Sequence, residues 1–100
     1  QGQRVTQFPV DTIADGLRAI VGVLNFRIIQ DHVERVLTVS EAGIIDAMAL
    51  AWLHYRMLIE PSSATVIAAI REHRQHFEGR RVGVIISGGN VELTQLPFLP

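Results

Sequence analysis

The residues best suited to bind a ligand are Ser87-Gly88-Gly89-Asn90, which follow an apolar run at residues 81–87. The two glycines allow the backbone to turn sharply and to approach a ligand closely, while Ser87 and Asn90 offer a hydroxyl and an amide as neutral hydrogen-bonding groups. In an open α/β sheet, ligands bind beyond the carboxyl ends of strands, so this turn is a candidate site. On its own, the same pattern is equally typical of a plain turn.

The four histidines do not indicate a catalytic or metal centre. His73 and His76 are three residues apart and could share a metal ion on one helix face, but no third ligand has a suitable spacing. His32 and His54 are each isolated from the other histidines, and a lone histidine is more often structural than catalytic. We therefore expect no metal site and no catalytic residue in this chain, and a solvated face for His73 and His76.

The aspartates Asp11 and Asp15 are four residues apart and could be drawn as an acid–base pair. Capping and turn roles explain them better, because they flank Thr-Ile-Ala and precede Gly16. Trp52 and Tyr55 share one predicted helix, where core and interface roles are more common than a stacking platform.

The composition excludes several classes of protein. All nine basic residues are arginine, so the chain offers no side-chain amine for a Schiff base. It contains no cysteine, which excludes disulfides, thiolate nucleophiles and Cys-based zinc sites. A net charge of −1 gives no electrostatic attraction to nucleic acid or to an anionic membrane surface. No apolar run approaches the ~18 residues of a membrane span, and we expect a cytoplasmic protein.

Three helices are predicted to position the candidate turn. The first begins after Gly16, because a glycine inside a helix costs about 1 kcal/mol against alanine. The second starts at Ser40-Glu41, a capping signal with a carboxylate near the positive helix end, and runs to about residue 58. Pro61 starts the third, which runs to about residue 74. The second helix has an apolar stripe expected to face the core, formed by Ile44, Ile45, Met48, Trp52 and Leu53.

Two strands are predicted, at residues 35–39 and 81–87. The first is rich in β-branched residues, and the second is apolar without alternation, as in a strand covered on both faces within a parallel sheet. Helices that alternate with apolar strands indicate the α/β class. Since two strands make a poor sheet, we expect this segment to complete a sheet begun elsewhere.

Four motifs, in this order, resemble the C-terminal part of threonine deaminase, serine dehydratase and serine racemase, a family of fold-type-II pyridoxal-phosphate enzymes. They are Asp11-Thr-Ile-Ala-Asp-Gly-Leu17, Val39-Ser-Glu41 before a helix, Glu60-Pro-Ser62, and Val84-Ile-Ile-Ser-Gly-Gly-Asn-Val91. The resemblance runs from about residue 11 to the end, and its last motif is the most specific. At Ser63 the sequence departs from the family's usual Glu-Pro-Ser-Gly or Glu-Pro-Thr-Ala.

The resemblance implies the α/β, three-layer fold of the tryptophan-synthase-beta-like enzymes, with residues 1–100 as one segment, the C-terminal part of the catalytic domain. In this family a lysine near the N-terminus holds pyridoxal 5'-phosphate and a glycine-rich loop binds its phosphate, so both would lie upstream. The serine matching Ser87 contacts the pyridine nitrogen, and the Gly88 backbone lies beside the ring. The loop matching Gly16 and the carboxylate matching Glu60 line the same cavity.

The activity implied by the resemblance is that of a threonine/serine dehydratase, which converts L-threonine or L-serine to a 2-oxo acid and ammonia. The 100 residues alone would be inactive. A serine racemase, or a dehydratase for another hydroxyamino acid, would share the four motifs. A stand-alone, non-catalytic interaction module would also explain the missing lysine. The expected partners are the N-terminal part of the same enzyme, an amino-acid substrate and further copies of the chain in a homo-oligomer.

Overall fold

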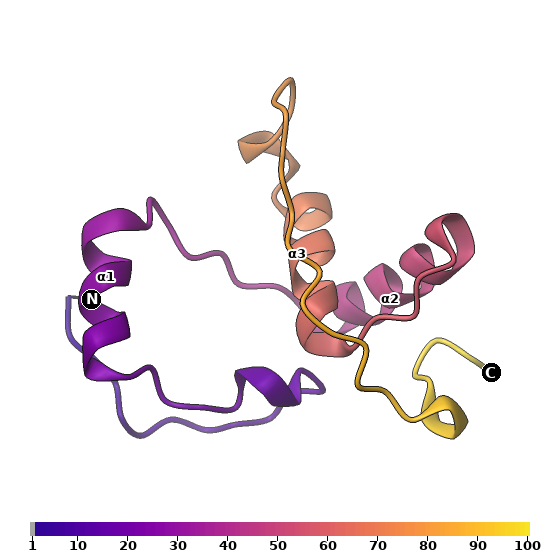
Figure 1. Ribbon diagram of the computed structural model, residues 1–100, viewed down its shortest axis with the longest axis horizontal. Helices are drawn as coiled ribbons and strands as arrows, with labels where there is room; N and C mark the ends of the chain where they lie inside the picture. Colours follow the sequence, from indigo (N-terminus) through magenta and orange to yellow (C-terminus); the bar gives the residue numbers. More distant parts are fainter. Residues whose placement is uncertain (1) are drawn as a thin grey trace.

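Two helices, α2 (Glu41–Tyr55) and α3 (Pro61–Glu72), pack against each other at the centre of the computed structural model, which describes residues 2–100 (Figure 1). A third helix, α1 (Val23–His32), lies apart from this pair and contacts neither helix. The connecting segments contain three short 3₁₀ helices, η1 (Asp15–Leu17), η2 (Arg74–His76) and η3 (Leu93–Gln95). No helix among the described residues is long and apolar enough to cross a membrane.

The starts of α2 and α3 confirm the capping signals in the sequence. The Ser40 side chain caps α2 by accepting a hydrogen bond from the Gly43 amide at 2.9 Å. Pro61 occupies the first turn of α3, directly after the extended residue Glu60. At the other end of α2, Arg56 adopts the left-handed conformation with φ 56°, which stops the helix and turns the chain toward α3.

The core lies between α2 and α3 and is built largely from small side chains. On α2 the buried residues are Ile44, Ala47, Met48 and Ala51, a spacing of three and four that places them on one helix face. Ala64 and Ala68 meet them from α3 and are fully buried. Trp52 and Leu53, predicted to belong to this stripe, are 44% and 59% exposed, so that part of the prediction was wrong. The buried face passes through the alanines instead.

The first predicted helix does not form where it was expected. After Gly16 the chain makes only the short η1, and α1 begins at Val23, after the extended residue Gly22. No side chain caps α1, and none of its residues is buried; Leu24 is 70% exposed. Without a core to pack against, the apolar residues after Gly16 are not held in one continuous helix.

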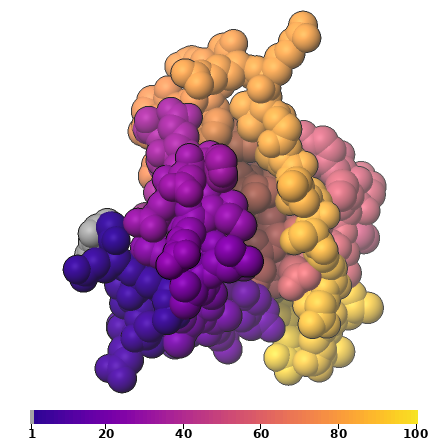
Figure 2. Space-filling view, turned by 60° about the vertical axis from the view of Figure 1, so that its left-hand side comes forward, coloured from indigo at the N-terminus to yellow at the C-terminus, as the bar shows by residue number. Residues whose placement is uncertain are grey.

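The two predicted strands are not formed by the described residues. A strand needs a neighbour with which to exchange backbone hydrogen bonds, and neither residues 35–39 nor residues 81–87 meet one within residues 2–100. The second segment runs beside α3, and Figure 2 shows it as an orange strip with the pink residues of α2 visible beyond it. Ile85 at its centre is 81% exposed. The radius of gyration is 14.7 Å, against about 13 Å for a compact domain of this length, so the arrangement is open.

Candidate functional site

Two segments that are distant in the sequence are hydrogen-bonded to the start of α3. The Oγ of Ser62 accepts a hydrogen bond from the Gly16 amide at 2.9 Å. The Oγ of Ser63 accepts one from the Ser87 amide, also at 2.9 Å. Because consecutive residues of an α-helix point about 100° apart, two adjacent serines reach two different segments. The loop that contains Gly16 and the turn after Ser87 are therefore both anchored to one helix end.

Glu60, the residue before α3, packs against the same turn. Its amide donates to the Gly88 carbonyl at 3.1 Å. A Cβ placed on Gly88 would lie only 1.8 Å from Oε1 of Glu60, and a Cβ on Gly89 would lie 2.9 Å from the Leu58 carbonyl oxygen. The glycine pair thus lets residues 58–60 and the turn approach closely. Gly16, Glu60, Ser87 and Gly88, the four residues predicted to line one cavity, come together around the start of α3.

Ser87 presents its two polar groups in different ways. Its amide is held by Ser63, which is 2% exposed and part of the core. Its side chain is exposed, so the hydroxyl is available to a ligand. Gly88, the next residue, is half-buried and has no side chain to cover it. The arrangement is an exposed neutral hydroxyl beside a residue without a side chain, which allows a ligand to approach the backbone closely.

The loop before Gly16 is held by Glu41, a contact that the sequence did not indicate. Oε2 of Glu41 accepts a hydrogen bond from the Ile13 amide at 2.9 Å. The Thr12 hydroxyl and this amide hold the pKa of Glu41 below its ordinary range. Asp15 has the predicted turn role, since its Oδ1 accepts from the Gly16 amide at 2.9 Å. Sequence analysis gave Glu41 only a helix-start role, because nothing in the local pattern identifies a partner 28 residues away.

Glu72 makes a second contact of this kind, between the end of α3 and the start of α2. Its carboxylate accepts from the Ser40 amide at 3.1 Å and also from the Ser40 hydroxyl. These bonds, the hydroxyl first, hold the pKa of Glu72 below its ordinary range. A Cβ on Gly43 would lie 2.0 Å from Oε1 of Glu72, so the absence of a side chain at Gly43 lets the carboxylate approach the start of α2 closely.

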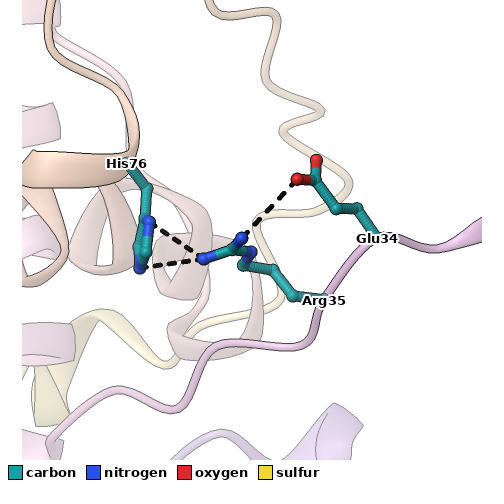
Figure 3. A network of polar contacts seen from close by, with 3 residues as sticks. All are labelled: Glu34, Arg35 and His76. Carbon is teal, nitrogen blue, oxygen red and sulfur yellow. Dashed lines mark hydrogen bonds and ion pairs between the residues drawn. The ribbon is translucent and has the colours of Figure 1, made fainter.

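His73 and His76 are half-buried rather than solvated, so the expectation of a solvated face was wrong. Nε2 of His73 donates to the Thr38 carbonyl at 2.7 Å. Nη1 of Arg35 lies 3.0 Å from Nδ1 of His76, while its Nη2 lies 3.6 Å from Oε1 of Glu34 (Figure 3). These contacts attach residues 34–38 to the end of α3. No group of three or more His, Cys, Asp or Glu side chains suited to a metal ion occurs in residues 2–100.

The comparisons with known proteins all indicate the same class of enzyme. A family model described as pyridoxal-phosphate dependent enzyme matches residues 1–88. The β-hydroxyaspartate dehydratase of Paracoccus denitrificans (strain Pd 1222) is 46% identical over 87 residues, which are 87% of this chain and 28% of that protein. The serine racemase of Dictyostelium discoideum is 45% identical over 96 residues, 94% of this chain and 30% of that protein. The crystal structure of a threonine deaminase from T.th. matches with a TM-score of 0.81 and 32% identity, covering 90% of this chain and 32% of that one. The chain therefore spans about 30% of the length of the proteins it matches.

Proposed function

Because the chain belongs to the family of pyridoxal-phosphate dependent enzymes, we propose that it forms one wall of the cofactor site in an ammonia-lyase acting on β-hydroxy amino acids. The substrate is L-threonine or L-serine, and the products are a 2-oxo acid and ammonia. Two of the matched proteins, a β-hydroxyaspartate dehydratase and a threonine deaminase, support this class of reaction. The comparisons confirm the predicted fold class, that of the fold-type-II pyridoxal-phosphate enzymes, of which this chain forms a part.

The residues around the start of α3 fit one end of the cofactor. Ser87 offers a hydroxyl for the ring nitrogen, and the half-buried Gly88 backbone would lie beside the ring. Gly16 and Glu60 would line the same cavity, because both are anchored beside the turn. The sequence contains no lysine, so the Schiff-base amine has to come from another part of the complete enzyme, meaning the full-length protein that contains these residues.

The observation that carries the proposal is the neutral hydroxyl at Ser87. Pyridoxal phosphate, when bound, supplies the electron-withdrawing ring that acidifies the Cα–H bond of the amino acid. A serine hydroxyl does not hold a proton on the ring nitrogen as a carboxylate would. Ser87 therefore limits how much negative charge can be drawn away from Cα. This favours expulsion of the β-hydroxyl over return of a proton to Cα, and so favours elimination over racemisation.

A racemase for the same amino acids is the second candidate. The 45% identity to a serine racemase favours it. The two candidates differ in what happens at Cα after the proton has left, which is a difference in products and can be measured.

The test is a product assay on the complete enzyme with pyridoxal phosphate. Wild-type protein should release 2-oxo acid and ammonia from L-serine or L-threonine in excess over the D-amino acid. Ser87→Asp should shift the ratio toward the D-amino acid, because a carboxylate favours a protonated ring nitrogen. Gln95→Glu is the matched control, since it introduces the same charge at an exposed position outside the turn, and it should leave the ratio unchanged.

Two outcomes would count against the assignment. A wild-type enzyme that forms only the D-amino acid would establish the racemase instead. A Ser87→Asp variant that retains both its cofactor and the parent's product ratio would mean that Ser87 does not contact the ring. Ser87→Ala should weaken cofactor binding by about 1 kcal/mol, or about fivefold in Kd, because one hydrogen bond is lost.

A further inference from the structure

Ser63 is the one polar side chain that is buried within residues 2–100, with 2% of its surface exposed. The side chains buried around the same helix face, Ala64 and Ala68, are apolar. A hydroxyl in such a place costs free energy unless it is hydrogen-bonded. The Ser63 oxygen accepts from the Ser87 amide at 2.9 Å, and this bond makes the burial of the hydroxyl tolerable.

The bond holds the backbone of Ser87 and leaves its side chain exposed. One residue later, the Gly88 carbonyl accepts from the Glu60 amide at 3.1 Å. Two successive residues of the turn are thus anchored to the start of α3, one through a side chain and one through the backbone. With the amide of Ser87 and the carbonyl of Gly88 both fixed, the direction of the Ser87 Cα–Cβ bond is fixed as well, so the hydroxyl is restricted to the few staggered positions around that bond.

We infer that Ser63 is a positioning residue of the reaction: it aims the Ser87 hydroxyl at the ring nitrogen without itself contacting the cofactor. The inference rests on the proposed function, since it needs a cofactor ring at the turn.

The first measurement concerns the tether alone and needs no cofactor. In the complete enzyme, Ser63→Ala removes one oxygen from a buried site and nearly preserves its volume, so the fold should persist. Hydrogen exchange at the Ser87 amide should become at least about fivefold faster, because the amide loses its acceptor. Ser62→Ala is the matched control: it removes the neighbouring hydroxyl and should leave the Ser87 amide protected, while the Gly16 amide keeps Oδ1 of Asp15 as an acceptor.

The second measurement asks whether Ser63 acts through Ser87. Ser63→Ala, Ser87→Ala and the double variant are titrated with pyridoxal phosphate, and the cofactor's visible absorbance is followed against pH. Both single variants should weaken binding by a few fold and shift the absorbance profile in the same direction. The double variant should be no worse than Ser87→Ala, since residues that act through one contact are not additive.

The outcomes distinguish a failure of the positioning role of Ser63 from a failure of the proposed function. Unchanged exchange at Ser87 in Ser63→Ala, or additive losses of cofactor affinity in the double variant, would overturn the positioning role and leave the proposed function standing. A wild-type enzyme that takes up no pyridoxal phosphate would refute the proposed function, and the positioning role with it. Faster exchange at Ser87 together with non-additive binding losses would support the inference.

Discussion

Gly88 and Gly89 are adjacent, but replacing each of them by alanine should bring the new Cβ against a different neighbour. At Gly88 the new Cβ would lie 1.8 Å from Oε1 of Glu60, the mobile end of a side chain. At Gly89 it would lie 2.9 Å from the carbonyl oxygen of Leu58, which is backbone. Neither glycine has a positive φ, so alanine meets no conformational strain of its own. A difference in stability between Gly88→Ala and Gly89→Ala therefore reports on the atoms that each new Cβ contacts.

The structure sets the size of each effect. The Glu60 oxygen must withdraw by about 1.6 Å to reach ordinary van der Waals contact, 3.4 Å, and rotation of its side chain achieves this. Gly88→Ala should therefore cost only about 0.5 kcal/mol of stability. At Gly89 the Leu58 carbonyl must yield by about 0.5 Å, and it is held beside Ile59, which is 3% exposed. Gly89→Ala should cost about 1–3 kcal/mol, the usual penalty for overpacking.

Urea unfolding of the two variants in the complete enzyme, beside a cofactor titration, measures both effects. Gly88→Ala should keep nearly the parent's midpoint but bind pyridoxal phosphate more weakly, because Glu60 has been pushed aside. Glu60→Ala in the Gly88→Ala background removes the clash and should recover the small loss of stability. If Gly88→Ala is as destabilising as Gly89→Ala and the second change brings no recovery, the close approach of Glu60 to Gly88 is wrong.

Two further predictions concern other contacts. The Ser40 hydroxyl and amide lower the pKa of Glu72, so the stabilisation is present above the ordinary carboxylate pKa and is lost as pH falls through the lowered value. The unfolding midpoints of wild type and Glu72→Gln should therefore differ at neutral pH and converge in acid; a constant difference from pH 7 to pH 3 would contradict this. The 100 residues expressed alone should self-associate, because Val84 and Ile85 are 46% and 81% exposed on an unpaired extended segment. Light scattering that shows a monodisperse monomer at micromolar concentration would instead favour a stand-alone interaction module.

The sequence predicted the starts of α2 and α3 because those signals are local. A serine followed by a glutamate, and a proline after an extended residue, act within a single turn of the chain. The start of α1 was missed for the complementary reason: α1 has no capping side chain and buries no residue, so little in its own sequence fixes where it begins. The two predicted strands did not form because a strand depends on a partner as well as on its own residues.

The candidate site was predicted through the family resemblance and not through periodicity or spacing. Gly16, Glu60, Ser87 and Gly88 were assigned to one cavity because four motifs occurred in the family's order, and the structure brings them together. The contacts that hold them there, from Ser62, Ser63 and Glu41, were not predicted. Each is a bond between residues 24 to 46 positions apart, and a serine or glutamate carries no local mark of such a partner.

The hydroxyls of Ser62 and Ser63, which anchor two segments from consecutive residues, determine where this protein can tolerate insertions and deletions. One residue inserted between Pro61 and Ser62 would rotate the rest of α3 by about 100° relative to its start, and each hydroxyl would turn away from its amide. The other end of the helix is different: Gly79 has a φ of 74° and open space around it, and residues 78–81 are exposed. Insertions there disturb no bond that closes the site. Among related sequences, length variation should therefore collect at residues 78–80 and be absent from residues 60–63.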